Sequence, residues 1–197
     1  ESAYDAIAAG GGAQPALVPM DLAAAGHAEY ESLVQLLRRE LCRLDGIVHA
    51  AASFDGLTPI GMHKPDEWLR ALHVNVSAPF ALTQACMPLL TAASDSAVVF
   101  VLDNPELVRK AHWGAYGVSK AATERFVEIL HQETEHTPLR AHALLPAPMR
   151  TALRRQAYFG EDTSKLPLPD ATAEAAVYLL SPQGAAARGG MLDLRHD

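Results

Sequence analysis

The sequence predicts an α/β fold in which a doubly wound parallel sheet lies between two layers of helices. Short apolar runs of strand length alternate along the chain with longer stretches of helical periodicity. Runs such as Ala97–Leu102 are apolar throughout, which is typical of parallel strands covered by helices on both faces. The links between the runs are long enough for the helices that connect parallel strands.

The expected elements follow one another in a regular order. The chain opens on a helix-like segment, Ser2–Ala9, which ends at the triple glycine Gly10–Gly12. The segment from His27 to Arg43 has apolar residues at three- and four-residue spacing and is expected to be an amphipathic crossover helix. A further helix is expected to run from Trp113 toward Glu135. Five runs are expected to be strands: Ala16–Met20, Gly46–Ala51, Ala97–Leu102, Leu139–Leu145 and Gly190–Leu194.

Length and composition favour one globular domain over residues 1–197. At 197 residues and 49% hydrophobic content, the chain has enough apolar material for one core. Its 16 Lys and Arg face 23 Asp and Glu, which gives a net charge of −7. This acidic balance excludes the basic surface that binding to a nucleic-acid backbone requires.

The sequence gives no indication of export or of membrane insertion. Its two cysteines, Cys42 and Cys86, lie far apart and form no CxxC pair. No stretch approaches the roughly 20 apolar residues that cross a bilayer, and the first residues show no basic-then-apolar signal pattern. We therefore expect a soluble protein of the reducing cytoplasm.

The segment WGAYGVSK places Tyr116 and Lys120 four residues apart on one face of a helix. A phenol with an ordinary pKa of about 10 is a poor acid–base group at neutral pH. A nearby ammonium group favours the phenolate and so lowers that pKa. The pair alone is a weak indication, because an exposed Tyr and Lys often occur at this spacing by chance.

Other segments surround this pair in a characteristic order. Asp21 in PMDL is followed by the strand end HAAA, then by Asn75 in HVNV, by YGVSK and by Thr151 in PAPMRT. This order and spacing resemble the short-chain dehydrogenase/reductase family of the classical type, and the resemblance spans nearly the whole chain. The WGAY and RTALR segments further resemble a bacterial oxidoreductase branch of that family. The resemblance implies a Rossmann-like, three-layer α/β/α domain that binds NAD or NADP, with no preference between them.

The resemblance also implies a role for each residue. Tyr116 is the implied acid–base group, Lys120 lowers its pKa and holds the nicotinamide ribose, and Asn75 completes a proton relay. Asp21 is implied to lie beside the adenine ring, and Thr151 to contact the amide and phosphate end of the cofactor. A helix-interior or kink-capping role is the alternative for Asn75, and an N-cap role is the alternative for Asp21.

Two departures from the family pattern concern whole functional groups. The first strand, glycine-rich turn and first helix that hold a pyrophosphate are not found, and Gly10–Gly12 cannot replace them because they follow a helix. Asp103 stands thirteen residues before Tyr116, where the family has a serine. An ionised carboxylate only accepts hydrogen bonds, so Asp103 would oppose carbonyl reduction and raise the pKa of Tyr116. Catalysis would survive if Asp103 were protonated or turned away, or if Asn104 supplied a donor.

Two further departures alter the segments that are expected to contact the cofactor. The triple alanine Ala50, Ala51 and Ala52 stands where the family has Asn-Ala-Gly. It removes a polar side chain and adds a methyl group where glycine permits close approach. The segment Pro146–Pro148 replaces a Pro-Gly turn and stiffens the loop expected beside the nicotinamide.

The nine histidines do not predict a metal site. In HQETEH, His131 and His136 are five residues apart, so they do not share a helical face as a zinc-binding HExxH pair does. The acidic residues beside them indicate a hydrated helix end. We therefore expect both histidines to face solvent.

The helices expected over Asn75–Leu90 and Ala115–His136 bear on assembly. Both are richer in Ala, Leu and Val than one sheet face needs. The resemblance implies that such helices pair across a two-fold axis, which predicts a homodimer or homotetramer. A role as core helices only is equally open.

The sequence thus favours an NAD(P)-dependent oxidoreductase that transfers hydride between nicotinamide and a small-molecule carbonyl or alcohol. The alternative is a non-catalytic member with the same fold, which serves as a binding or oligomerisation module. Asp103, the triple alanine and the missing glycine-rich turn favour this alternative. The expected catalytic residues are Tyr116, Lys120, Asn75 and Asp103, and the expected cofactor-binding residues are Asp21, Ala50, Ala51, Tyr116, Lys120, Pro146 and Thr151.

Overall fold

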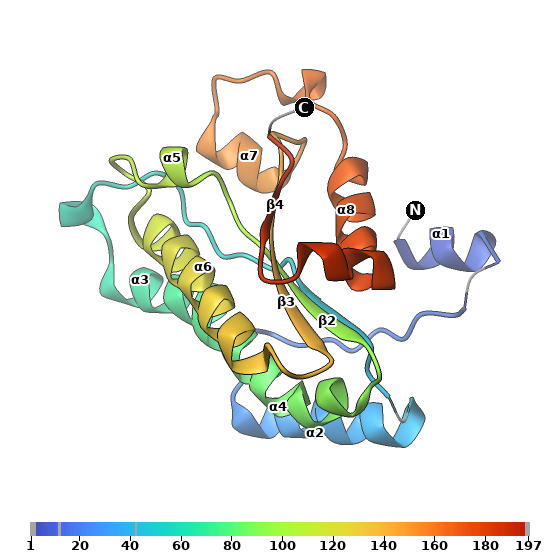
Figure 1. Ribbon diagram of the computed structural model, residues 1–197. Helices are drawn as coiled ribbons and strands as arrows, with labels where there is room; N and C mark the ends of the chain where they lie inside the picture. The colour runs from blue at the N-terminus through green and yellow to red at the C-terminus, as the bar shows by residue number, and fades with distance from the viewer. Residues whose placement is uncertain (1–2, 12, 42, 196–197) are drawn as a thin grey trace.

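The computed structural model describes residues 3–11, 13–41 and 43–195, so Ser2, Gly12 and Cys42 lie outside the described residues. In this part of the chain one sheet has four strands in the order β1-β2-β3-β4. All neighbouring pairs are parallel (Figure 1). The strands are β1 (Gly46–His49), β2 (Ser96–Val101), β3 (Leu139–Leu145) and β4 (Met191–Asp193). The predicted parallel sheet is confirmed.

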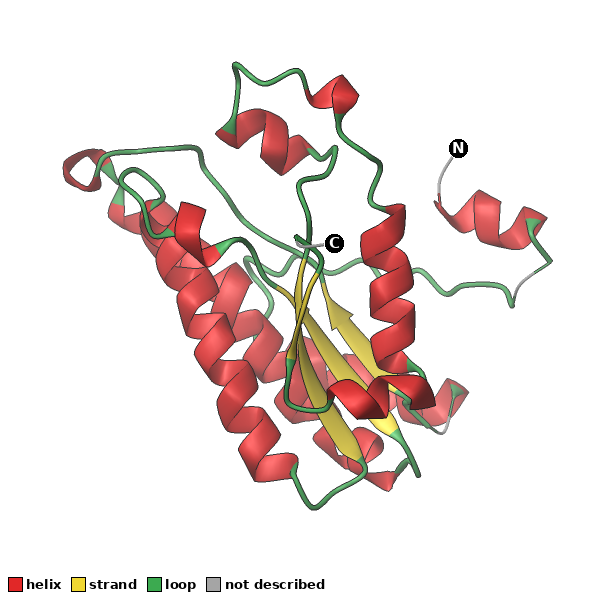
Figure 2. Ribbon diagram, turned by 45° about the horizontal axis from the view of Figure 1, so that its top comes forward, coloured by secondary structure: helices red, strands yellow, loops and turns green. Residues whose placement is uncertain are grey.

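Helices cover both faces of this sheet, as Figure 2 shows. On one face lie α4 (Ala78–Ala92) and α6 (Gly114–Thr134), and α2 (His27–Glu40) packs against α4. On the other face lies α8 (Asp170–Leu180), followed by the 3-10 helix η4 (Pro182–Ala187). The predicted three-layer α/β/α arrangement is therefore confirmed. The other helices are α1 (Ala3–Ala9), α3 (Pro65–Leu72), α5 (Pro105–Val108), α7 (Ala152–Ala157) and the 3-10 helices η1 (Ile60–Met62) and η3 (Thr163–Lys165).

The two-sided burial of the sheet explains why β2 is apolar on both of its faces. On β2, Val98 and Phe100 belong to the core cluster beneath α4 and α6. Val99, between them, packs instead with Leu179 of α8. Because successive side chains of a strand point to opposite faces, a strand covered on both sides favours apolar residues on both faces.

Residues Ala16–Met20, which were expected to be a strand, form none. A strand requires a neighbour whose backbone receives its hydrogen bonds, and the described residues place no strand beside this segment. Leu17 and Val18 are exposed as a result.

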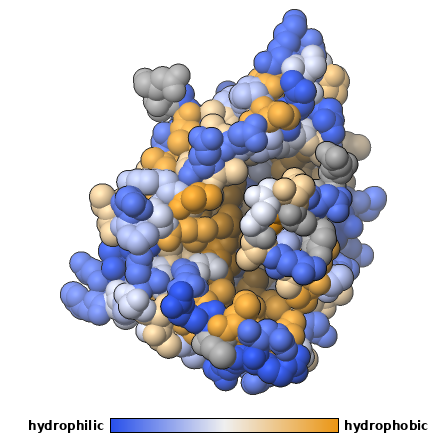
Figure 3. Space-filling model, turned by 90° about the vertical axis from the view of Figure 1, so that its right-hand side faces the viewer, coloured by the Kyte–Doolittle hydropathy of each residue, from blue (hydrophilic) through white to orange (hydrophobic). Residues whose placement is uncertain are grey.

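Figure 3 shows that apolar side chains gather in a hollow on the face of the molecule beside α8.

Some element boundaries also differ from the expected ones. The helix expected to end at Arg43 ends at Glu40, and the helix expected to begin at Asn75 is preceded by a π-helical turn, η2 (His73–Ser77). The strand expected to reach Ala51 ends at His49. Residues 50–52 therefore lie beyond the part of β1 that is hydrogen-bonded to β2.

The described helices include none with both the length and the apolar character that spanning a bilayer requires.

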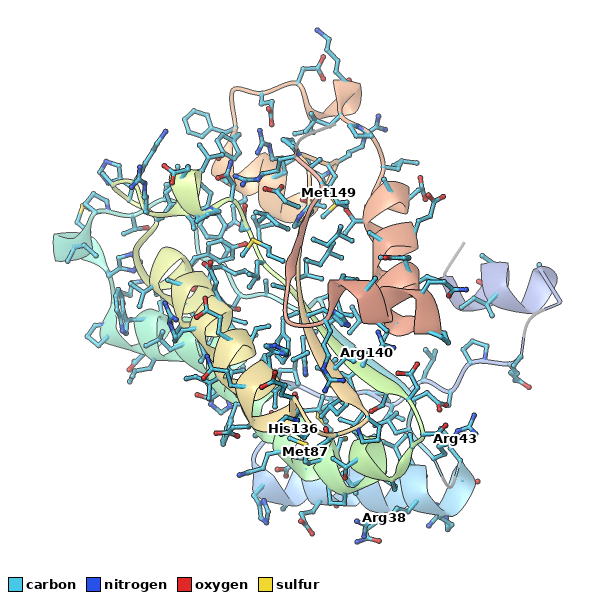
Figure 4. All side chains as sticks on the ribbon, viewed as in Figure 1. Arg38, Arg43, Met87, His136, Arg140 and Met149 are labelled. Atoms are coloured by element: carbon cyan, nitrogen blue, oxygen red, sulfur yellow. The ribbon has the colours of Figure 1, made fainter. Side chains whose placement is uncertain are left out.

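A buried polar cluster lies between the amino-terminal end of β3 and the end of α8. The Arg140 side chain is 2% exposed, pairs with Asp95 at 2.9 Å and donates to the Leu179 carbonyl oxygen at 2.8 Å (Figure 4). It also donates to His142 Nε2 at 3.2 Å. A buried charge is tolerated when it is paired and hydrogen-bonded in this way.

The expectation that His131 faces solvent is wrong, although His136 is exposed. The His131 ring packs against Gly189, where a Cβ atom would lie 2.2 Å from His131 Nε2. Gly189 also has a φ of 70°, a conformation that favours glycine. The sequence could not show this contact because the two residues belong to distant segments.

Among the described side chains, no group of three or more His, Cys, Asp and Glu is placed to hold a metal ion.

His142 makes stability depend on pH. Its Nδ1 donates to the Ala187 carbonyl oxygen at 3.2 Å while Nε2 accepts from Arg140, so the ring is neutral. Burial, and next the Arg140 charge, lower the pKa of His142 to about 4. The unfolded chain therefore takes up a proton first as the pH falls, and the free energy of unfolding decreases between about pH 6.5 and pH 4.

We expect His142→Gln to remove roughly 2 kcal/mol of this pH-dependent loss, allowing for solvent screening. Urea unfolding at several pH values between 4 and 7 measures the slope. His27→Gln is the matched control, because the His27 side chain is 85% exposed. A residual slope is expected from His49, whose pKa burial also lowers to about 4. Equal slopes in wild type and His142→Gln would contradict the assignment.

Candidate active site

A cavity of about 410 Å³ lies at the carboxyl ends of the parallel strands. The chain reaches it directly after each strand: with Ala50 and Ala52 after β1, Asp103 after β2, Pro146 to Met149 after β3, and Arg195 after β4. Met149, labelled in Figure 4, lies at this end of the sheet near α7. Ligands of open α/β sheets bind at this edge, where helices on opposite faces diverge.

Tyr116 and Lys120 line this cavity from the first turns of α6. Both side chains are buried, and the Lys120 Nζ lies 5.5 Å from the centre of the Tyr116 ring. Nζ donates to the Val101 carbonyl oxygen at 2.8 Å. Burial lowers the pKa of Lys120 to about 8, and the charge of Asp103 opposes that decrease.

Asp103 points toward Tyr116 rather than away from it. The Tyr116 hydroxyl donates to Asp103 Oδ2 at 2.8 Å, and the Asn104 backbone N–H donates to Asp103 Oδ1 at 2.7 Å. Burial, and next the negative charge and hydrogen-bond acceptance of Asp103, raise the pKa of Tyr116. The surroundings thus raise the pKa of Tyr116, whereas Lys120 was expected to lower it. The direction agrees with the effect that was expected from Asp103.

Asn75 lies behind the cavity wall, not among the residues that line it. Its Nδ2 donates to the Ser53 carbonyl oxygen and to Ser119 Oγ, both at 2.9 Å, and its Oδ1 accepts from the Ser53 N–H at 2.7 Å. Its own carbonyl oxygen accepts from Thr123 Oγ1 at 3.0 Å. Asn75 therefore ties the segment after β1 to α6, which holds Tyr116 in place.

The expected cofactor residues are not all brought together. Ala50, Pro146 and Thr151 line the cavity, whereas Ala51 is not part of its wall. Thr151 Oγ1 accepts from the Arg154 N–H at 3.1 Å and so caps α7, which leaves the hydroxyl hydrogen available as a donor.

Asp21 lies elsewhere, in a second hollow between residues 18–25 and α2. Its Oδ1 accepts from the Ala23 N–H at 2.9 Å, and its carbonyl oxygen accepts from the Ala25 N–H at 2.8 Å. These bonds stabilise the turn that leads into α2. The N-cap of α2 is Gly26, so Asp21 is not the N-cap that the alternative predicted. Asp21 is also not among the residues that line the main cavity.

Four residues that shape the cavity were not identified as site residues from the sequence: Trp113, Arg154, Tyr158 and Arg195. The Arg154 guanidinium lies 3.9 Å from the centre of the Tyr158 ring. Arg195 Nη1 donates to Asn104 Oδ1 at 2.6 Å. A signal for Arg195 was present, because it follows the last apolar run and so falls at the carboxyl end of a strand. Arg154 and Tyr158 carried no such signal, since both follow a loop of irregular course.

Comparison with known proteins agrees with this fold. The family pattern described as short chain dehydrogenase matches residues 1–161. The chain belongs to the short-chain dehydrogenase family. It is 35% identical over 158 residues to the "Uncharacterized oxidoreductase YciK" of Escherichia coli K12, which covers 80% of this chain and 62% of that protein. It thus spans less than two thirds of the length of this curated relative.

Solved structures of short-chain dehydrogenases superpose closely on the chain. One from Pseudomonas syringae has a TM-score of 0.92 at 34% identity, and the match covers 96% of this chain and 77% of that one. One from Escherichia coli CFT073, solved in complex with NADPH, has a TM-score of 0.90 at 31% identity, with coverage of 96% and 79%. These matches show the Rossmann-like fold.

The close approach of α6 to α5 fixes the position of Tyr116 beside Asp103. Gly117 follows Tyr116 within α6, and a Cβ atom there would lie 2.1 Å from the Val108 carbonyl oxygen. Because that neighbour is backbone, the loop that carries Asp103 and α5 would have to move. A glycine in the interior of a helix is thus explained by packing, not by backbone conformation.

We expect Gly117→Ala to destabilise the fold by roughly 1 to 3 kcal/mol through overpacking. This effect outweighs the gain of about 1 kcal/mol in helix propensity that alanine ordinarily brings. Denaturant unfolding measures the difference. Gly61→Ala is the matched control, since no atom lies within 4 Å of the Cβ position at Gly61. A Gly117→Ala protein as stable as the control would refute the proposed contact.

Proposed function

We propose that this protein is an NAD(P)-dependent oxidoreductase that transfers hydride between nicotinamide and a small-molecule carbonyl or alcohol. The observation that carries the proposal is the position of Tyr116 and Lys120 together in the cavity at the strand ends. A buried hydroxyl beside a buried amine in such a cavity can exchange a proton with a substrate oxygen. The NADPH complex of the Escherichia coli CFT073 structure supports a nicotinamide cofactor.

The cavity fits the nicotinamide end of such a cofactor. An ammonium group has three donors, and among the described residues only the Val101 carbonyl oxygen accepts from Lys120 Nζ. Lys120 therefore has donors left for ribose hydroxyls, and Thr151 has a hydroxyl hydrogen left for the amide or phosphate end. For the pyrophosphate, the described residues offer no glycine-rich turn between a strand and a helix. The fit therefore extends to the nicotinamide half only.

When bound, the cofactor supplies or receives the hydride. The protein's own residues position the substrate and move its proton. Tyr116 exchanges a proton with the substrate oxygen, and Lys120 provides the positive charge that favours an anionic oxygen nearby. Trp113 and Tyr158 line the cavity beside Tyr116, and their rings favour a substrate with an apolar or aromatic substituent.

We propose further that the protein self-associates through α4 and α6. Val118 and Ile129 of α6 are both about half exposed, and eleven residues, or three turns, separate them along one face. Phe80 of α4 is also exposed and packs its ring edge-on against Phe126 of α6. Exposed apolar side chains on two neighbouring helices are suited to an isologous dimer contact.

The oxidoreductase proposal is tested by titrating NADPH and NADH against the protein while following cofactor fluorescence. We expect saturable binding of at least one cofactor and turnover with an aromatic ketone or alcohol. Tyr116→Phe should keep cofactor binding and lose turnover by a factor of about 100 or more, because the proton-exchanging hydroxyl is gone.

Tyr178→Phe is the matched control, since Tyr178 is exposed on α8, and it should change neither measurement. No binding of either cofactor at millimolar concentration would refute the proposal. That result would favour the alternative of a Rossmann-like binding module without the chemistry.

A further inference from the structure

We propose that Asp103 is the proton acceptor of this site, acting through Tyr116, and that the site therefore binds an alcohol in preference to the corresponding carbonyl compound. This inference rests on the proposed function and specifies its substrate class. The preferred ligand is an alcohol that carries an aromatic or apolar substituent, as the walls formed by Trp113 and Tyr158 indicate.

The two hydrogen bonds of Asp103 show where the proton of the pair resides. A backbone N–H can only donate, so Asp103 Oδ1 accepts from Asn104. One further proton lies between Asp103 Oδ2 and the Tyr116 oxygen, which are 2.8 Å apart. A carboxylic acid is a far stronger acid than a phenol, so this proton stays on Tyr116 and Asp103 carries the charge.

The surrounding charges permit an ionised Asp103. Lys120 of α6 and Arg154 of α7 are the cations whose charges interact with it. Arg154 is already paired with Glu161, through two hydrogen bonds of 2.6 and 2.8 Å. Lys120 makes no ion pair among the described residues and donates only to a carbonyl oxygen. Lys120 is therefore the cation that balances Asp103.

The other charged or titratable groups around Asp103 and Tyr116 change the charge balance between Asp103 and Lys120 little. Arg195, after β4, reaches Asn104 but pairs with Asp193 through two hydrogen bonds of 2.9 and 2.7 Å. Tyr158, after α7, is a neutral phenol whose pKa burial raises. Within the described part of the chain, the cavity thus holds one carboxylate, Asp103, and one amine, Lys120, that form no ion pair with another charged side chain.

This arrangement determines which ligand oxygen the site accepts. A carbonyl oxygen needs a donor, but the Tyr116 hydroxyl hydrogen is already donated to Asp103. An alcohol hydroxyl can donate to the Tyr116 oxygen, whose lone pairs are free to accept. The chain of donors then runs from the alcohol through Tyr116 to the carboxylate. The charge of Asp103 also opposes the partial negative charge of a carbonyl oxygen.

The proton moves along this chain when the alcohol is oxidised. The C–H bond of the alcohol breaks, and its hydrogen leaves with the electron pair for the oxidised nicotinamide ring. The hydroxyl proton passes to the Tyr116 oxygen while the proton of Tyr116 passes to Asp103 Oδ2. The carbonyl double bond forms, and Asp103 becomes a carboxylic acid that returns its proton to water.

The first test measures the Tyr116 proton directly and needs no cofactor. The ultraviolet absorbance of phenolate is followed against pH in wild type, in Asp103→Asn and in Asp103→Ser. The same titration is made for each protein with Tyr116→Phe added, and the difference between the two curves is the signal of Tyr116. We expect the Tyr116 signal to move at least one pH unit lower in both Asp103 variants, because the adjacent charge is gone. Circular dichroism at each pH confirms that the fold persists. Asp66→Asn, at an exposed position of α3, is the control and should cause no shift.

The second test uses 1-phenylethanol and acetophenone as probes. Wild type should bind the alcohol at least tenfold more tightly than the ketone, and Asp103→Ser should reduce this preference. Oxidation by wild type should extend to lower pH than oxidation by Asp103→Asn. Oxidation by Asp103→Asn should require alkaline pH, because Tyr116 must then ionise itself.

The outcomes separate this inference from the function on which it rests. Turnover with an unshifted Tyr116 titration and an unchanged pH profile in Asp103→Asn would overturn the role of Asp103 and leave the oxidoreductase function in place. A shifted titration with no cofactor binding and no turnover would refute the proposed function, while still locating the proton between Tyr116 and Asp103.

Discussion

The pairing of β2 with β3, buried on both faces, is the constraint on which the structure depends. Parallel strands cannot be joined by tight turns, so each link must cross the sheet through a helix. The carboxyl ends of the strands therefore meet at one edge, and the cavity forms where the chain leaves them. Asp103 belongs to the site because it follows β2, and Tyr116 belongs to it because α6 begins at the same edge.

Burial dominates the electrostatics of the cavity. It lowers the pKa of Lys120 to about 8 and raises that of Tyr116, so burial shifts each group toward its neutral form while Lys120 stays mostly charged at neutral pH. The Asp103 charge then acts on each of them in the same sense, by favouring the protonated form. A serine at this position would leave Lys120 as the main charge near the phenol. One side chain thus decides whether the hydroxyl of Tyr116 serves mainly as a donor to the protein or to a ligand.

Much of the fold could be predicted because it depends on local pattern. The run at 97–102 is apolar at every position, which suits a strand covered on both faces. The run Ala16–Met20 has the same local character but no strand beside it, and pairing is a property that no single segment encodes. The prediction of that strand was wrong for this reason.

The site could be predicted in part for similar reasons. Tyr116 and Lys120 share a helix, so their four-residue spacing determines their relative position. The contact of Asp103 with Tyr116 depends on how the loop after β2 approaches α6, which the sequence does not specify. Arg154 reaches the cavity through α7, a short helix in an irregular connection. Asp21 was assigned to the cofactor by resemblance, whereas its carboxylate stabilises a local turn.

The position of β1 has a consequence for backbone dynamics. Within the described residues β1 has a neighbour, β2, on one side only. Amide hydrogens bonded in a ladder exchange with solvent slowly, because they must first open, whereas those on a free edge exchange quickly. Alternation of fast and slow amides along Gly46–His49 would therefore be the signature of a bare edge. Uniformly slow exchange along this strand would reveal that another strand, from this protein or a partner, has been added beside it.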